Sequence, residues 1–201
     1  MTQEPDEEAK VQQREVQRML GRCLLRLQQY ERLIKAIMAA NVVSAPLREL
    51  EAARAKRAKS VARKTLGTLV GELVGSFLVA GEPEMMQDAP DHCASVSVRF
   101  ALGLSDEDYA QTEAELGELV LLRNTLVHHF IDQHDLWSLD GCRHAQESLN
   151  ADYRRIDQHY QRLQSWAEDL GRMQRYLAEH VRSDEFRDQL FGDAVPTGPG
   201  G

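Results

Sequence analysis

The longest regular pattern in this chain is an apolar stripe through its C-terminal third. From about Cys142 onward, mostly apolar side chains recur in steps of three and four residues. They are Leu149, Tyr153, Ile156, Tyr160, Leu163, Ala167, Leu170, Gln174, Leu177 and Val181. This spacing predicts one helix about 60 Å long at 1.5 Å per residue, with a single apolar face. Such a face needs a long antiparallel partner within the chain or a coiled-coil seam with a second copy, and part of the helix should project or dimerise.

A second stripe lies near the N-terminus and predicts a helix over residues 6–40. Its members, again three and four residues apart, are Val16, Leu20, Cys23, Leu27, Tyr30, Ile34 and Ile37. A face of this kind belongs in a core. We therefore expect this helix to be the partner of the C-terminal one.

A helix is also expected over residues 46–78, with Pro46 in its first turn. Its second half is apolar and carries Gly67, Gly71 and Gly75, which are four residues apart. Glycines at this spacing share one side of a helix and would let another helix approach closely.

The next helix should begin after Ser105 and end near residue 134. Ser105 is a good helix N-cap, and the three carboxylates that follow it suit the positive end of the helix dipole. Residues 136–141 then read as a turn that should bury Trp137.

The segment between residues 81 and 105 interrupts the helical pattern. Residues 82–91 hold two prolines and several charges, which predicts a loop. Residues 94–101 alternate apolar and polar side chains, which predicts a short strand. Because an isolated strand is marginally stable, it should pair with residues 78–86 or with the same strand of a second copy.

Together these elements predict an all-α fold, an antiparallel four-helix bundle with long N- and C-terminal helices and a small non-helical or β insert. Residues 1–192 would form this domain. Residues 193–201, rich in Pro and Gly, would be a flexible linker or tail. A tail of that composition hints at a fused downstream domain.

Composition excludes several classes of protein. The chain holds 24 Lys and Arg against 32 Asp and Glu, a net charge of −8 over 201 residues, so contact with nucleic acid needs a local basic patch. Cys23, Cys93 and Cys142 are odd in number and share no CxxC spacing, which disfavours a disulfide framework and a zinc site. No apolar run approaches the length of a membrane span. We therefore expect a cytoplasmic protein with no membrane contact.

One basic patch is present in the first half of the helix predicted over residues 46–78. Six cations fall within eleven residues, with no acid among them: Arg54, Lys56, Arg57, Lys59, Arg63 and Lys64. A charge run alone usually forms a solvated face. Next to a site that acts on phosphates, it would instead contact RNA phosphates. The sequence leaves both interpretations open.

Residues 119–130 set polar side chains into an otherwise apolar helix. One helical face carries Leu119, Leu122, Leu126 and Phe130. Asn124 and His128 are four residues apart and close enough to share a hydrogen bond. Arg123 and His128 lie roughly 140° apart on an α-helix. We therefore expect one copy to bring this pair together poorly, and two copies crossing about a two-fold axis to converge both pairs on a shared cleft.

The order Arg123, Asn124, three further residues and His128 resembles the motif of the HEPN family of small helical-bundle proteins. His129 would match the motif with one more intervening residue. Active HEPN proteins are metal-independent endoribonucleases that work as dimers, so the resemblance implies an RNA substrate and no cofactor. It also implies that Arg123 stabilises charge on the phosphate and that Asn124 orients the histidine or binds a phosphate oxygen. His128 would transfer protons, with His129 as a second candidate acid or base.

The same resemblance implies a toxin–antitoxin or defence setting with an antitoxin partner. HEPN toxins silenced by a nucleotidyltransferase carry Tyr two residues after the His, and this chain has Phe130 there, so the hydroxyl that such control needs is absent. A noncatalytic RNA-binding or dimerisation module is the alternative function. Arg123 and His128 could also form a buried structural network.

A metal site is the remaining alternative for this region. His128 and Asp132 are four residues apart, as two ligands on one helix would be. Such groups at a helix end are more often solvated or capping. We therefore predict no metal site.

Overall fold

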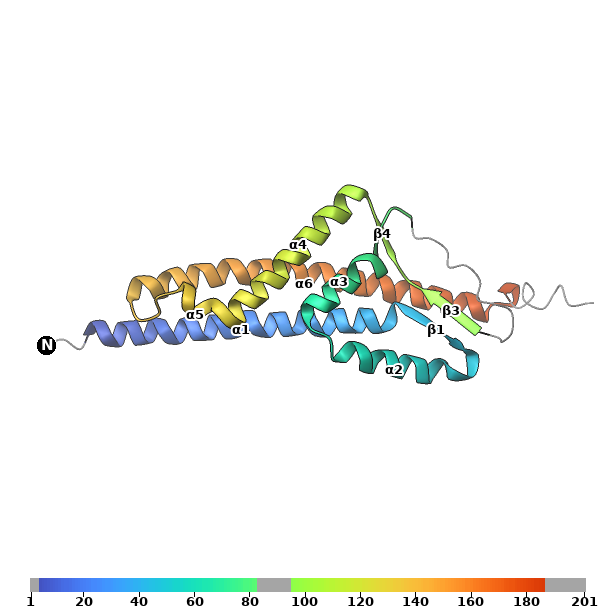
Figure 1. The fold of residues 1–201 in the computed structure, drawn as a ribbon, viewed down its shortest axis with the longest axis horizontal. Coiled ribbons are helices and arrows are strands. Elements are labelled where there is room, and N and C mark those ends of the chain that lie inside the picture. Colours follow the sequence, from blue (N-terminus) through green and yellow to red (C-terminus); the bar gives the residue numbers. More distant parts are fainter. Residues whose placement is uncertain (1–3, 83–94, 187–201) are drawn as a thin grey trace, which may run out of the picture.

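The computed structural model of the protein describes residues 4–82 and 95–186. Its helices are α1 (Glu4–Ala40), α2 (Leu50–Ala62), α3 (Leu66–Ser76), α4 (Asp106–Asn124), α5 (Phe130–Gln133) and α6 (Leu139–Arg182), with a 3-10 turn η1 (Leu47–Glu49) and a π-helical turn η2 (Thr125–His129). Its strands are β1 (Val42–Pro46), β2 (Leu78–Ala80), β3 (Ser95–Arg99) and β4 (Leu102–Leu104). The predicted helical fold with long terminal helices and a small insert is confirmed (Figure 1). The predicted tail 193–201, and all but the first residue of the predicted loop 82–91, lie outside the described residues.

The two long helices, α1 and α6, lie side by side and form the main seam of the core (Figure 1). Every residue of the predicted α1 stripe except Leu20 is buried. The buried members of the predicted α6 stripe are Leu149, Ile156, Leu163 and Leu170. Neither these nor the other helices of the described segments are long and apolar enough to cross a lipid bilayer.

The long helices run parallel to each other, so the prediction of an antiparallel partner is wrong. Gln13 Nε2, near the start of α1, donates to Leu136 O just before α6 at 2.9 Å. Gln174 Nε2, near the end of α6, donates to Ala40 O at the end of α1 at 3.1 Å. Steps of three and four residues align apolar side chains on one face whichever way the partner runs. The stripe therefore carried no information about direction.

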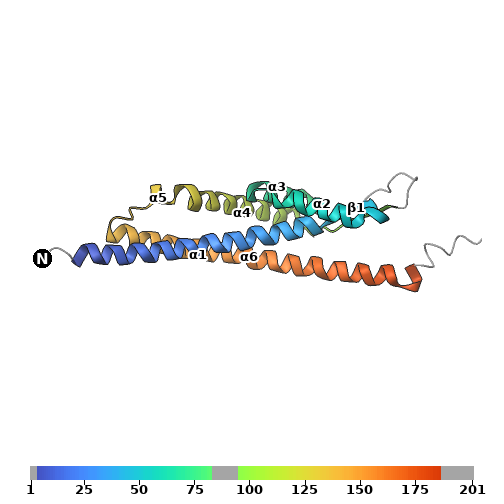
Figure 2. The same ribbon diagram turned by 90° about the horizontal axis from the view of Figure 1, so that it is seen from below.

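The antiparallel neighbour of this pair is α4. Arg155 Nη2 on α6 lies 2.8 Å from Glu118 Oε2 on α4, and Arg162 Nη1, further along α6, lies 2.5 Å from Glu115 Oε2, earlier on α4. Figure 2 shows α4 together with α2, α3 and α5 on one side of α1 and α6. The bundle is thus antiparallel between α4 and α6 but parallel within the long pair, because the return pass is made by this second layer.

The helix predicted over residues 46–78 is two helices, and its start differs. Pro46 ends β1 instead of opening a helix. The first helix ends at Ala62, and Thr65 Oγ1 caps the next one by accepting from Thr68 N at 3.4 Å. Within α2, all of whose residues are described, Val61 alone is buried, whereas α3 buries Leu66, Leu69, Val70 and Leu73. The break lets the apolar half enter the core and leaves the basic half at the surface.

The three glycines of this segment have different roles. A Cβ at Gly67 would lie 3.5 Å from Val120 Cγ1 of α4, which is ordinary van der Waals contact, so α4 packs beside this position without requiring glycine there. A Cβ at Gly71 would meet nothing within 4 Å. Gly75 has φ +92°, which side chains rarely tolerate, and it turns the chain from α3 toward β2.

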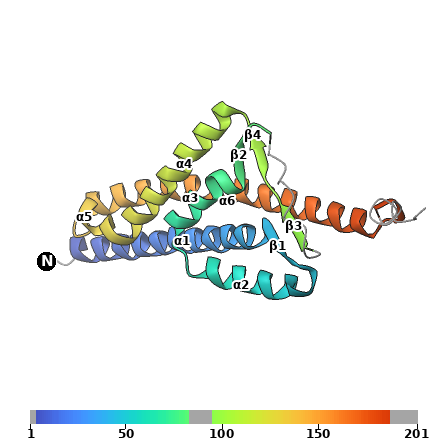
Figure 3. The same ribbon diagram turned by 45° about the vertical axis from the view of Figure 1, so that its right-hand side comes forward.

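The predicted short strand is present as β3, but its partner is neither of those expected. It pairs antiparallel with β1, with Val43 opposite Val98. The start of the predicted partner segment forms β2, which pairs in parallel with β4 instead. Figure 3 shows β1 beside β3, and β2 beside β4 near α3 and the start of α4. The sequence did not predict β1, because its five residues are too few to show a clear alternation and follow α1 directly.

Two alanine substitutions should separate the roles of these glycines. Gly71→Ala should raise the free energy of unfolding by about 0.5–1 kcal/mol, because alanine is the better helix former and its Cβ has open space. Gly75→Ala should lower it by about 1–2 kcal/mol, because its backbone is left-handed. Urea denaturation of both variants measures this difference. Effects of the same sign would contradict the assignment.

Candidate functional site

A π-helical turn brings Arg123 and His128 together within one chain. Turn η2 interrupts the α-helical path between α4 and α5, and a π-helix closes i→i+5 hydrogen bonds instead of i→i+4. Arg123 Nη1 lies 3.5 Å from His128 Nε2, five residues later. In an uninterrupted α-helix the two side chains would diverge by roughly 140°. The prediction that one copy brings them together poorly is therefore wrong.

The inner side of this segment is fixed in the core. Of the predicted apolar face, Leu119, Leu126 and Phe130 are buried and Leu122 is half-buried, so this face packs against the core. On the outer side His128 is exposed and Arg123 is half-buried. The pair is thus presented to solvent on a rigid support, and the alternative of a buried structural network does not fit.

Asn124 is exposed and contacts Arg123, not His128 as expected. Its Oδ1 accepts from Arg123 Nη1 at 3.2 Å. A guanidinium can only donate, so a hydrogen bond to His128 Nε2 requires that nitrogen to be the acceptor and places the imidazole proton on Nδ1. Asn124 therefore orients the guanidinium, which in turn faces the unprotonated nitrogen of the imidazole.

His129 has a separate partner. Its Nδ1 lies 3.7 Å from Asp132 Oδ2, and both side chains are exposed. Its ring centroid is 6.3 Å from that of His128, with the rings edge to face. The carboxylate considered as a co-ligand of His128 is thus beside His129. Within residues 4–82 and 95–186, no three His, Cys, Asp or Glu side chains gather as metal ligands would.

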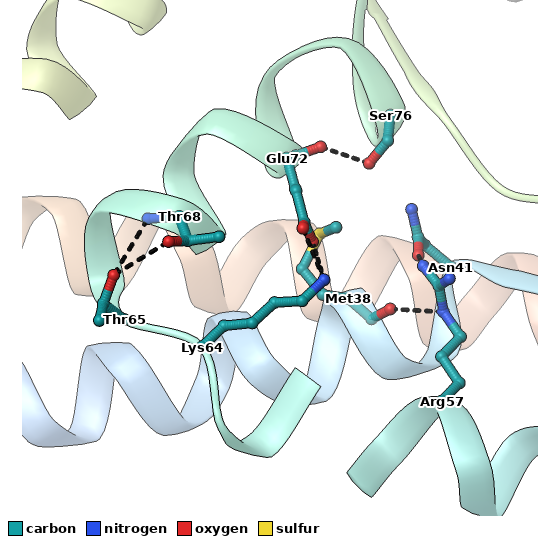
Figure 4. Close-up of polar contacts among 8 residues, drawn as sticks. All are labelled: Met38, Asn41, Arg57, Lys64, Thr65, Thr68, Glu72 and Ser76. Carbon is teal, nitrogen blue, oxygen red and sulfur yellow. Dashed lines mark hydrogen bonds and ion pairs between the residues drawn. The ribbon is translucent and has the colours of Figure 1, made fainter. Parts of the chain in front are cut away.

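Two of the six cations predicted to contact RNA support the fold instead (Figure 4). Arg57 Nε donates to Met38 O at 2.8 Å, and Arg57 Nη2 donates to Asn41 Oδ1 at 2.8 Å. Lys64 Nζ lies 2.5 Å from Glu72 Oε1 of α3. Arg57 therefore clamps α2 to the end of α1, and Lys64 ties the turn after α2 to α3.

The other four cations are exposed, and their side chains form no ion pair or hydrogen bond with the described part of the chain. They are Arg54, Lys56, Lys59 and Arg63, which we call the α2 patch. The patch belongs to the same layer as α4 and α5 but lies toward the other end of the long axis (Figures 1 and 2). The structure therefore does not bring it next to Arg123 and His128.

The predicted burial of Trp137 is the expectation that differs most from the structure. It was expected to be buried and is 80% exposed. Its neighbour Leu136 packs against the core in its place. A single turn offers no periodicity from which to decide which of two adjacent apolar side chains points inward, so no sequence signal marked Trp137 as accessible.

Alanine substitution should distinguish the structural cation from a patch cation. Arg57→Ala should lower the free energy of unfolding by about 1–3 kcal/mol, because it removes two charge-assisted hydrogen bonds and leaves the buried Asn41 Oδ1 without its donor. Arg54→Ala, one turn earlier and exposed, should change it by less than about 0.5 kcal/mol. Chemical denaturation of both variants gives the comparison, and equal losses would contradict the clamp.

Comparisons with known proteins assign no family to this chain. No protein-family model, curated protein or solved structure matches it. What points to a function is the motif at Arg123, Asn124 and His128 together with the geometry of those three side chains.

Proposed function

We propose that the protein is a metal-independent endoribonuclease of the HEPN type, working as a homodimer in a cytoplasmic toxin–antitoxin or defence setting. The observation that carries this proposal is the 3.5 Å contact between Arg123 Nη1 and His128 Nε2 on an exposed turn. Cleavage of an RNA phosphodiester needs a proton-transfer group beside a cation that stabilises the phosphate. This pair supplies both, and its order in the chain is that of the HEPN motif.

The chemistry follows from the donors and acceptors of the pair. His128 Nε2 takes the proton of the ribose 2′-hydroxyl, and the 2′-oxygen then attacks phosphorus. The bond from phosphorus to the 5′-oxygen breaks, and that oxygen takes up a proton. The products are a 2′,3′-cyclic phosphate and a 5′-hydroxyl. A guanidinium carries five N–H donors, so Arg123 can contact the phosphate while it keeps its bond to Asn124.

A second proton-transfer group has to protonate the leaving oxygen. His129 is one candidate, since it adjoins His128 and lies 3.7 Å from the Asp132 carboxylate. His128 of a second copy is the other candidate, which requires a dimer built around this turn. Exposed apolar side chains on the same segment, Leu121 and Val127, support such a contact.

The dimer can be tested by light scattering at micromolar concentration. The wild-type chain should have the mass of two chains. Leu121→Asp should yield a monomer, because it would bury a charge in the proposed contact. Leu25→Asp is the matched control, since Leu25 is similarly exposed on α1 (62% against 66%) and should leave the dimer intact. A monomeric wild-type chain would rule out the contribution of a second copy.

The reaction itself gives the next prediction. Cleavage of single-stranded RNA should proceed in EDTA, because the nucleophile is the ribose hydroxyl, and it should spare DNA, which lacks that hydroxyl. His128→Ala and Arg123→Ala should each lower the rate roughly 10²-fold or more. Both variants should keep the wild-type circular dichroism spectrum and melting temperature, since neither side chain is buried.

His129→Ala is the control for the choice of histidine. Loss of cutting in His129→Ala with retention in His128→Ala would place the catalytic imidazole at residue 129. Loss in both variants would make His129 the second proton-transfer group within one chain. Retention of cutting in both variants would contradict the proposal.

The α2 patch should contribute to RNA binding through phosphates. Arg54→Glu with Lys59→Glu should weaken RNA binding and flatten its dependence on salt, because fewer counterions are released. The melting temperature should stay unchanged, as both residues are exposed and outside the Arg57 clamp. Arg154→Glu with Arg175→Glu, two exposed cations of α6, is a control of equal charge. Equal effects of the two pairs would indicate nonspecific attraction.

A noncatalytic RNA-binding module is the second candidate function. The four exposed cations of the α2 patch favour it, since binding through phosphates requires no catalytic pair. RNA binding that depends on the α2 patch, without any cleavage by the wild-type chain, would support this alternative.

A further inference from the structure

Trp137 is the most exposed large apolar side chain of the described residues. The chain has two tryptophans, and the other, Trp166, is only 8% exposed within the core. An exposed indole in a flexible tail would mean little. Trp137 is different because the loop between α5 and α6 that carries it is fixed in place.

The backbone of this loop is bound from two helices. Leu136 O accepts from Gln13 Nε2 of α1 at 2.9 Å and from Cys142 Sγ of α6 at 3.3 Å. Burial raises the pKa of the Cys142 thiol, so the sulfur keeps the proton that it donates. Trp137 N donates to Asp135 Oδ1 at 3.1 Å. Both residues before the indole are therefore held, and the side chain is presented outward.

The loop also presses against the first turn of α6. Ser138 Oγ caps that turn by accepting from Gly141 N at 3.1 Å. A Cβ built on Gly141 would lie 1.9 Å from Asp135 O, so only glycine fits there. This close approach leaves the loop little freedom to fold the indole into the core.

An open pocket of about 320 Å³ is lined by residues 131–137, from α5 through this loop, which include Ile131 and Trp137. Its wall includes Asp132, the carboxylate that lies 3.7 Å from His129 Nδ1. His129 in turn adjoins His128. The pocket therefore adjoins the proposed catalytic side chains through Asp132, although neither of these two histidines lines it.

We propose that Trp137 and this pocket bind one unpaired base of an RNA strand by stacking on the indole. This inference rests on the proposed function, since it names the substrate class of the same site. Aromatic rings bind unpaired bases in this way, and every base offers a π-face.

The charges of the pocket favour a base over other occupants. Asp132 and Asp135 would repel a phosphate, but their oxygens can accept from the N–H groups of a base. Asp132 lies beside His129, and Asp135 Oδ1 accepts from Trp137 N. An apolar protein surface that covered the indole would still remove water from both carboxylates, which is unfavourable. A base satisfies both requirements because it combines an apolar face with a polar edge.

The consequence is a requirement for unpaired RNA. In a duplex each base face is already stacked and each edge is paired, so Trp137 could not reach one without opening the helix. Annealing a complementary strand should therefore protect the RNA from binding and cleavage. Phosphate attraction alone would predict the reverse, because the duplex carries more phosphate than the single strand.

The test uses the full chain and a twelve-nucleotide RNA of mixed sequence without self-complementarity. His128→Ala keeps the RNA intact during the titration, and Trp166→Phe leaves Trp137 as the sole indole. RNA should quench the fluorescence of this chain, and the same RNA annealed to its complement should not. Should Trp166→Phe fail to fold, anisotropy of labelled RNA with Trp137 variants gives an independent reading.

In that second measurement Trp137→Ala should bind RNA about 5- to 150-fold more weakly, as expected for the loss of one stacked base. Trp137→Phe should retain most of the affinity because it keeps an aromatic ring. Trp137→Leu is the discriminating variant, since it keeps apolar surface without a ring and should behave like alanine. Equal affinity of all variants, or RNA binding without quenching, would overturn the inference, as would a chain that binds no RNA.

Further outcomes distinguish base binding at Trp137 from a dimer contact at this residue and from the nuclease proposal. If Trp137→Ala converts a dimer to a monomer while Trp137→Leu does not, the indole contacts a second copy and the inference is overturned. If quenching and the variant series are as expected but the chain with His128 cuts nothing, base binding stands and the nuclease proposal fails. If the chain instead cleaves single-stranded and duplex RNA equally, and Trp137 variants cleave at the wild-type rate, the nuclease proposal stands and the base-binding inference fails.

Discussion

The apolar seam between α1 and α6 is the contact on which the remaining structure depends. Each of these helices alone would expose a continuous apolar stripe. Packed together, they bury most of both stripes in one core, which includes Val16 of α1 and Leu170 of α6. Because the two helices run parallel, the chain between them must travel back, and α4 makes that return pass. The exposed turn with Arg123 and His128 comes at the end of this pass, beside the first half of α1 (Figure 1). The position of the candidate site is thus set by the direction of the seam.

The sequence predicted what depends on periodicity and local capping. Both long helices, the start of α4 at Ser105 and the buried face that ends in Phe130 follow from spacing and from one capping hydroxyl. The relative direction of two helices, the pairing of strands and the shape of turns depend on contacts between distant residues, which no local pattern contains. The parallel seam and the pairing of β3 with β1 are of this kind. Within the site, the three motif residues were predicted, but their mutual geometry was not.

That geometry changed because a π-helical turn replaces an α-helical one at η2. Residues 123–130 obey a 3.6-residue period as well as any helix would, so the sequence gives no warning of a wider turn. The π-helical turn brings His128 toward Arg123, while Leu126 and Phe130 stay in the core. Similarly, Arg54 and Arg57 lie in one charge run, and only the contacts with Met38 and Asn41 give Arg57 a structural role.

The α2 patch and the Trp137 loop lie at separate points along the same molecule, which constrains how RNA could use both. Leu136 contacts α1 at Gln13, whereas Arg57 contacts it at Met38, and this interval is about 40 Å at 1.5 Å per residue. Stacked nucleotides advance by about 3.4 Å each, so a strand needs roughly ten or more to span it. A shorter RNA would engage only one of the two. Under the proposed function, the patch would therefore capture long strands, while selection of the base beside the scissile phosphate would fall to the turn and loop around His128.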